Sequence, residues 1–304
     1  ETYTHVLSSA ASDVYKRQTI VQATDSPPAS DRVFYIYSVN RVIINGITIR
    51  NGYINRRGGG IRVEGSTLEL NEVAVVDNIS NNAEHGDGGG ISVYDGGLGV
   101  QDCTISNNFA SGEGGGIHLS YSSASLLNST ISGNRATSGG AIGTLSDDAK
   151  NIWLHYMTVY DNKVTKNGGG MQLERAFSVY LENSIVAGND AGNNGPDIFG
   201  EIISDDYNLI GNTSDVTFTG TTTHNILDQD AELGALQNNG GPTFTHALLP
   251  SSPAIDAGNC INPLYDQRGQ IRPIDKPDVV NVADGCDIGA YEDDFKVNLP
   301  LVIN

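Results

Sequence analysis

The sequence predicts an all-β fold, a right-handed parallel β-helix with three strands per coil and an irregular, β-rich C-terminal cap. A glycine phrase, an alternating apolar phrase and an asparagine each recur about every 25 to 30 residues. Self-similarity at such a period is characteristic of solenoid proteins. Glycine triplets and β-branched runs disfavour a helical solenoid, and parallel strands joined by crossovers coil with a right hand.

The glycine phrase opens each predicted coil. A glycine pair or triplet precedes an apolar residue at 58–61, 88–91, 114–117, 139–142 and 168–171. We expect a tight corner there, in which one glycine adopts a positive φ and neighbouring coils approach closely. A phosphate-binding loop is the alternative, but it needs a lysine and a helix start after the glycines, and neither follows.

The second phrase alternates apolar and polar residues, as half-buried strands do. An asparagine follows this phrase in successive coils, and the coils are expected to stack ~4.8 Å apart. Side-chain amides at that spacing can form a hydrogen-bonded ladder. The predicted members of the asparagine ladder are Asn78, Asn108, Asn134, Asn162 and Asn189.

The chain divides into four predicted parts. Residues 1–18 contain a string that resembles a translated adapter sequence, so we expect them to be a non-native leader. The parallel β-helix is expected to occupy 19–232 and the irregular C-terminal segment 233–292. A short tail, 293–304, completes the chain.

The charge balance excludes two classes of partner. The chain carries 36 acidic and 17 basic residues, a net charge of −19, and such a surface repels nucleic acid and anionic membranes. No run approaches the ~20 apolar residues that a transmembrane helix needs, so we expect no membrane span. Free acidic polysaccharides are expected to be repelled as well, unless cations bridge the two surfaces.

The three cysteines indicate an oxidising compartment. Cys260 and Cys286 are predicted to form a disulfide, whereas Cys103 is expected to be a small buried thiol. No cysteine or histidine pair has the spacing of a metal site, and we expect no cofactor. Adjacent acidic pairs fit solvated turns or, as the alternative, Ca²⁺ ligands. They are Asp147-Asp148, Asp205-Asp206 and Asp293-Asp294.

Four short sequence phrases near the C-terminus are specific enough to indicate a protein family. They are Asn-Gly-Gly-Pro-Thr at 239–243, Ser-Pro-Ala-Ile-Asp-Ala-Gly at 252–258, Asp-Gln-Arg-Gly at 266–269 and Asp-Ile-Gly-Ala-Tyr-Glu at 287–292. With these phrases and the upstream Gly-Gly-Gly-Ile repeats, residues 33–292 resemble choice-of-anchor Q domain proteins. The resemblance implies a right-handed β-helix that is secreted or held on a bacterial cell surface. It transfers no catalytic residue, because the family carries no established catalytic motif.

The strand after each glycine phrase carries the best candidate binding face. Period 2 places one set of its side chains outward, where they stack from coil to coil. We expect these side chains to line an exposed sheet groove, the place where β-helix enzymes bind sugars. The predicted ligand-binding residues are Tyr94, His118, Gln172 and Glu174.

A polysaccharide lyase is one hypothesis for this face. Such an enzyme needs Ca²⁺ or an arginine to neutralise a uronate carboxylate, and a base to take the adjacent proton. His118 is the candidate base, Arg62 the candidate neutralising group and Glu113 a candidate metal ligand. Arg62 and His118 are expected two coils, roughly 10 Å, apart. A solvated face is favoured over this trio, and passive contact with a glycan is the third option.

Other candidate residues have structural alternatives. The aromatic residues Trp153, Tyr156, Tyr160 and Tyr180 fit a sugar-stacking strip or, in preference, packing between coils and turns. His246 is expected to be packed or hydrogen-bonded. An internal ion-pair lock is predicted in the C-terminal segment, formed by Asp266, Arg268, Arg272, Asp287 and Glu292.

These expectations favour a non-enzymatic bacterial protein that is extracellular or on the cell surface. It would form a rigid rod for adhesion, matrix structure or glycan contact. Its expected partners are polysaccharide or other copies of itself, because open strand edges at the coil ends can pair between subunits. A carbohydrate-active enzyme, either a lyase or a glycoside hydrolase, is the alternative.

Overall fold

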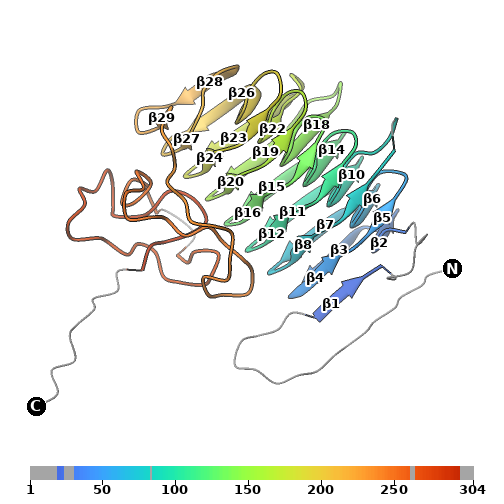
Figure 1. Cartoon of the computed structure of the whole chain (residues 1–304), viewed down its shortest axis with the longest axis horizontal. Coiled ribbons are helices and arrows are strands. Elements are labelled where there is room, and N and C mark those ends of the chain that lie inside the picture. The colour runs from blue at the N-terminus through green and yellow to red at the C-terminus, as the bar shows by residue number, and fades with distance from the viewer. Residues whose placement is uncertain (1–18, 24–30, 83, 261–263, 295–304) are drawn as a thin grey trace, which may run out of the picture.

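The computed structural model describes residues 19–23, 31–82, 84–260 and 264–294. Throughout these residues the fold is all-β, and parallel strands stack into a solenoid of about 7 turns (Figure 1). The predicted β-solenoid is therefore confirmed. The expected leader, residues 1–18, and residues 295–304 of the expected tail lie outside the described residues.

Three parallel sheets build the solenoid (Figure 1). Sheet I contains, in spatial order, β1 (Thr19–Gln22), β4 (Ile47–Arg50), β8 (Ala74–Val76), β12 (Thr104–Ser106), β16 (Thr130–Ser132), β20 (Thr158–Tyr160), β24 (Ile185–Ala187), β27 (Leu209–Ile210) and β29 (Ile226–Leu227). Sheet II contains β5 (Tyr53–Ile54), β9 (Ile79–Ser80), β13 (Phe109–Ala110), β17 (Arg135–Ala136), β21 (Lys163–Val164) and β25 (Asp190–Ala191).

Sheet III has two limbs that meet at β26 (Ile198–Asp205), which also pairs with β28 (Val216–Thr221). The first limb contains β2 (Phe34–Tyr37), β6 (Ile61–Glu64), β10 (Ile91–Tyr94), β14 (Ile117–Ser120), β18 (Ile142–Leu145) and β22 (Met171–Gln172). The second limb contains β3 (Arg41–Asn45), β7 (Thr67–Asn71), β11 (Gly97–Gln101), β15 (Ser123–Leu127), β19 (Lys150–His155) and β23 (Phe177–Glu182). A coil thus supplies one strand to each limb, one to sheet I and a two-residue strand to sheet II.

The glycine phrases form the corners before the first limb, as predicted. The first glycine of each phrase has a φ between 61° and 75°. A β-carbon on Gly89, the second glycine of its phrase, would lie 2.5 Å from the carbonyl oxygen of Gly115 in the next coil. Because any side chain there would push the coils apart, the close stacking requires glycine.

The five asparagines form the predicted ladder. Oδ1 of Asn134, for example, accepts hydrogen bonds from the backbone N–H and the side-chain amide of Asn108, both at 3.0 Å. The ladder ends on Asp197, whose Oδ1 accepts the side-chain amide of Asn189 at 2.8 Å. Burial raises the pKa of Asp197 to about 6. The ladder therefore has a sixth position, which a search for asparagine alone misses.

The C-terminal segment, residues 233–292, lies along the flank of sheet I (Figure 1). Its described residues form isolated β-bridges and no strand. It is therefore a lateral clamp rather than a cover over the end of the solenoid, and we call it the flank segment. Its hydrogen bonds to sheet I include Thr104 Oγ1 to the Phe244 carbonyl (2.5 Å), Thr130 Oγ1 to Gln267 Oε1 (2.6 Å) and the Ala290 N–H to Thr158 Oγ1 (3.1 Å).

Buried charges hold the flank segment together, which agrees with the predicted ion-pair lock. Nε of Arg268 donates to Asp266 Oδ2 at 2.7 Å, with both side chains buried. Nη1 of Arg272 lies 3.6 Å from Glu292 Oε2, and this pair is fully buried. Burial raises the pKa of Glu292 and of its neighbour Asp287. Arg272 offsets part of the cost of burying these two carboxylates, but their pKa values stay raised.

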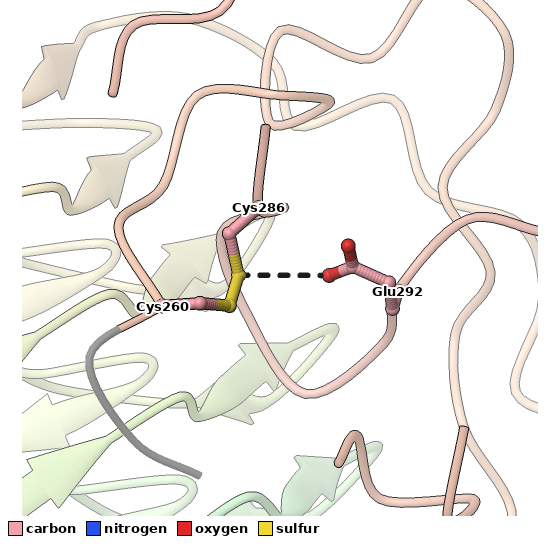
Figure 2. Close-up of side chains that lie close together, drawn as sticks. All are labelled: Cys260, Cys286 and Glu292. Atoms are coloured by element: carbon pink, nitrogen blue, oxygen red, sulfur yellow. Dashed lines mark hydrogen bonds between the residues drawn. A yellow bond between two sulfur atoms is a disulfide. The ribbon is translucent and has the colours of Figure 1, made fainter. Parts of the chain in front are cut away.

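The cysteines behave as predicted. Cys260 and Cys286 form a disulfide within the flank segment (Figure 2). Cys103 is a free, fully buried thiol, and burial raises its pKa to about 12. It is therefore an unreactive thiol packed between coils, where its sulfur accepts a hydrogen bond from the Val73 N–H at 3.3 Å.

Candidate functional site

The first limb of sheet III places the predicted site residues in two columns. Tyr35, Arg62, Ser92 and His118 occupy one column, because the strands of successive coils pair in register. The same column continues through Gly143 to Gln172. Tyr94 and Glu64 are partners in the second column. The structure therefore keeps Arg62 and His118 two coils apart, as expected.

The expectation that this whole column is an exposed groove is wrong. Arg62 is only 5% exposed and His118 only 1% exposed. Arg62 donates to Ser92 Oγ at 2.7 Å and to Glu64 Oε1 at 2.8 Å. Asp87, in the turn before the next glycine phrase, lies close enough to His118 to affect its pKa. The alternation of side chains along the strand correctly predicts the side of the sheet on which Arg62 and His118 lie, but the turns between strands cover that side.

His118 is poorly suited to act as the base of a lyase. Burial, together with the nearby Arg57 and Arg62, lowers its pKa to about 4, although Asp87 acts in the opposite direction. Its Nδ1 is buried and has no hydrogen-bond partner among the described residues. A neutral imidazole with so low a pKa is a weak proton acceptor near neutral pH, and substrate cannot reach it.

Glu113 lies beside this column, at the position of Gly143, which pairs with His118. Its Cβ is 3.1 Å from where a β-carbon on Gly143 would lie, so it packs over the gap that this glycine leaves. Burial, together with the nearby Asp87 and Glu174, raises the pKa of Glu113 to about 7. Of the predicted ligand-binding set, Gln172 is half-buried, and its Oε1 has no hydrogen-bond partner within the described part of the chain.

An open cavity of about 680 Å³ lies at the N-terminal end of the first limb. Four arginines line it, and we call it the arginine pocket. The arginines are Arg32, Arg56, Arg57 and Arg62, and His85, Asn82, Asp31 and Glu64 also contribute to the lining. They come from strand β6, from the residues just before β2, and from the turns after β5 and before β10. Four of the chain's 17 basic residues thus face one cavity of a protein whose net charge is −19.

The arginines of the pocket are only partly neutralised. Arg57 pairs with Asp87 at 2.9 Å and Arg62 with Glu64 at 2.8 Å. Arg56 has no acidic partner among the described residues. Burial lowers the pKa of Arg32, as does its neighbour Arg62, so the two guanidinium groups repel each other. An anion in the pocket would relieve that repulsion.

Tyrosines border the pocket and continue along the limb. Tyr35 is 56% exposed and stacks on Tyr37, with ring centroids 6.0 Å apart. Arg32 lies over the Tyr35 ring at 5.1 Å. Tyr94, a predicted ligand-binding residue, is 41% exposed and forms an edge contact with Tyr121. The rim of the pocket therefore offers flat aromatic faces next to cationic groups.

The predicted aromatic strip is divided between two surfaces. Trp153 and Tyr180 stack on the second limb with centroids 5.9 Å apart and ring planes at 10°. Tyr156 is instead buried under the flank segment, where its hydroxyl donates to the Asn259 carbonyl at 2.8 Å. Tyr160 packs against His246. One continuous strip is therefore wrong, and packing explains two of its four members.

One group of potential metal ligands converges within the described residues. Cys260, Cys286 and Glu292 lie together in the flank segment (Figure 2). Both sulfurs are already joined in the disulfide, and Glu292 Oε2 lies 3.7 Å from Cys286 Sγ and 3.6 Å from Arg272 Nη1. A disulfide is not a thiolate ligand, and a paired carboxylate beside an arginine does not attract a cation. These residues do not fit a metal centre.

No protein-family model matches this chain, and no curated protein or solved structure matches it either. In the described part of the chain, no helix has the length and apolar character to cross a membrane. The solenoid of about 7 turns is thus established by its own geometry.

Proposed function

We propose that this protein is an extracellular or cell-surface bacterial β-helix protein of the choice-of-anchor Q type that binds an acidic polysaccharide in the arginine pocket. The four C-terminal phrases support the family. The disulfide supports an oxidising location outside the cytoplasm. Its role is adhesive or structural, with the solenoid as a rigid support.

The arginine pocket is the observation that carries this proposal. Guanidinium groups bind carboxylates through paired, charge-assisted hydrogen bonds, which a uronate or another acidic sugar can accept. The exposed faces of Tyr35 and Tyr37 suit the apolar faces of sugar rings. The rest of the chain carries an excess of acidic residues, which disfavours binding of the same polymer elsewhere.

Binding without cleavage fits the pocket better than catalysis. The candidate base His118 is buried outside the pocket lining, with a lowered pKa. Among the described residues of the lining, His85 is the one imidazole. A lyase that used His85 would release unsaturated sugar ends, so that product distinguishes the alternative enzyme from a binding protein.

Calorimetry with the full chain tests the proposal. We expect polygalacturonate or alginate oligomers to bind, and we expect the double variant Arg32→Ala/Arg56→Ala to bind at least about tenfold more weakly, or about 1.4 kcal/mol. Arg41→Ala is the matched control, because Arg41 is exposed on β3 and pairs with Glu69 outside the pocket. Equal affinities for the wild type and the double variant would contradict the proposal.

A further inference from the structure

A second cavity separates the solenoid from the flank segment, and we propose that it binds a neutral oligosaccharide. Its volume is about 700 Å³. Turns at the end of sheet I strands form one wall, and residues 233–236 with Phe244 and His246 form the other. We call this cavity the flank groove. It contains none of the residues that line the arginine pocket.

The solenoid wall of the flank groove is a regular row of turns. Asp77, Asn107, Gly133 and Asp161 occupy equivalent positions after β8, β12, β16 and β20, each with a φ between 55° and 68°. Successive positions are ~4.8 Å apart, because each belongs to the next coil. Asp77, Asn107 and Asp161 are exposed, so their oxygens can accept hydrogen bonds from a ligand.

The flank segment supplies an aromatic face opposite this row. Phe244 is 51% exposed in the groove. Its backbone is fixed, because its carbonyl accepts hydrogen bonds from Thr104 and from Gln267. An exposed phenyl ring on a fixed backbone offers stacking area at a small cost in conformational entropy. Sugar rings bind in this way, with one apolar face on an aromatic ring and hydroxyls directed to polar groups.

The base of the groove is rigid. His246 Nδ1–H donates to the Gly234 carbonyl at 2.7 Å, and Nε2 accepts from the Ser132 hydroxyl at 2.8 Å. Tyr160 contacts the His246 ring edge-on, with centroids 5.0 Å apart. The expectation that His246 is packed and hydrogen-bonded is thus met. The polar atoms of its ring are already used, which leaves recognition to the aspartates and Phe244.

Charge selects a neutral ligand. None of the described residues that line the flank groove is an arginine or a lysine. Burial raises the pKa of Tyr160, and Asp230 and Asp161 raise it further, so the surroundings carry negative potential. A uronate would be repelled, whereas sugar hydroxyls can donate to the carboxylates of Asp77 and Asp161. The groove therefore suits a neutral glycan, and the protein would join two polysaccharides if the arginine pocket also binds as proposed.

A calorimetric panel of neutral hexasaccharides, composed of glucose, xylose, mannose or N-acetylglucosamine, tests the groove in the full chain. We expect at least one to bind, and we expect Phe244→Ala and Asp161→Gly each to weaken binding at least about tenfold. Glycine is tolerated at position 161, because Gly133 and Gly188 already occupy that turn with positive φ. The matched controls are Tyr265→Ala, an exposed ring outside the groove, and Asp95→Gly, an exposed turn residue with a φ of 49°.

Each outcome separates this inference from the proposed function. Loss of hexasaccharide binding in the two groove variants, with polygalacturonate binding retained, supports the flank groove as the neutral-glycan site. The inference is overturned if no neutral hexasaccharide binds, or if the groove variants bind as the controls do. Preferential binding of a basic oligopeptide in the groove would also overturn it, because the ligand would then be recognised by charge alone.

Discussion

The arginine pocket and the flank groove have nearly the same volume, about 680 and 700 Å³, and opposite charge. The pocket collects four arginines from the first coils. The groove has none, and the chain contains no lysine or arginine between residues 176 and 267. A net charge of −19 therefore describes neither region. In a solenoid each coil contributes its own strip of surface. The ligand that a region binds therefore depends on the charge of the few coils that form it, rather than on the net charge of the chain.

The two regions also differ in what holds them together. The described residues that line the arginine pocket all belong to strands and turns of the solenoid. The flank groove exists only while the flank segment is docked on sheet I. Undocking should therefore remove one site and leave the other, whereas a disturbance near the first coils should act on the pocket first.

The largest expected effect comes from Arg272→Met. Arg272 is buried, its Nη2 donates to the Gly289 carbonyl at 2.6 Å, and it lies against Glu292. Removal of one member of a buried pair costs about 3–5 kcal/mol, although protonation of Glu292 will offset part of this cost. We expect the flank segment to undock at a lower temperature, with neutral-glycan binding lost and acidic-glycan binding retained. Calorimetric unfolding and the two binding assays measure this.

Lys276→Met is the control for that experiment. It removes a half-exposed pair with Asp293 in the same segment, and such pairs contribute about 0–1 kcal/mol. Simultaneous loss of both binding activities in Arg272→Met would break the comparison, because the segment and the solenoid would then unfold as one unit.

A smaller effect is expected from pH, and it originates beside the arginine pocket. The folded protein raises the pKa of Glu113 to about 7 from 4.5, so folding favours the protonated carboxyl. The resulting stability is fully present below pH 4.5 and is lost as pH rises through 7. We expect Glu113→Gln to remove about 1–2 kcal/mol of this pH dependence.

Denaturant unfolding at pH 5, 6, 7 and 8 measures the contribution of Glu113. Glu69→Gln is the control, since Glu69 is a carboxylate on the second limb whose pKa is lowered by Arg41. We expect Glu69→Gln to keep the wild-type pH profile between 5 and 8. An unchanged profile in Glu113→Gln would show that other carboxyls, such as Asp197, carry the dependence.

The smallest expected effect is that of salt on ligand affinity. It tests whether the arginine pocket and the flank groove bind ligands of different charge. An increase in NaCl from about 0.05 to 0.5 M shortens the Debye length severalfold. We expect the affinity of the arginine pocket for an acidic oligosaccharide to fall severalfold and the affinity of the flank groove for a neutral one to change little. Titrations at both concentrations measure this, and equal salt dependence would contradict the assigned charges of the two ligands.

Most of the solenoid can be predicted because its determinants are local and periodic. Gly88-Gly89-Gly90 needs only its own corner and the next coil, and Asn108 needs only the asparagines one coil away. Asp197 escapes the pattern because a carboxylate replaces the amide at the end of the ladder. The position of the flank segment is harder to predict, since Thr130 meets Gln267 across 137 residues.

The candidate sites were less predictable than the fold. Alternation places Arg62 and His118 on the outer side of a strand, but it carries no information on the turns that bury them. A usable signal for the arginine pocket was present, because six arginines fall between residues 32 and 62. The flank groove had no such signal. Phe244 and Asp161 line the same cavity only because the flank segment docks on the solenoid.

The flank segment also limits how the chain can change length during evolution. It spans four consecutive coils, with hydrogen bonds to Asp102, Asn128, Tyr156 and Asn183. Gain or loss of a coil under this span would shift every later contact by ~4.8 Å and break the docking. These hydrogen bonds begin at Asp102, and the flank groove begins at Val76 and Asp77. Duplication or deletion of a coil before these residues would alter the arginine end while the clamped part keeps its structure.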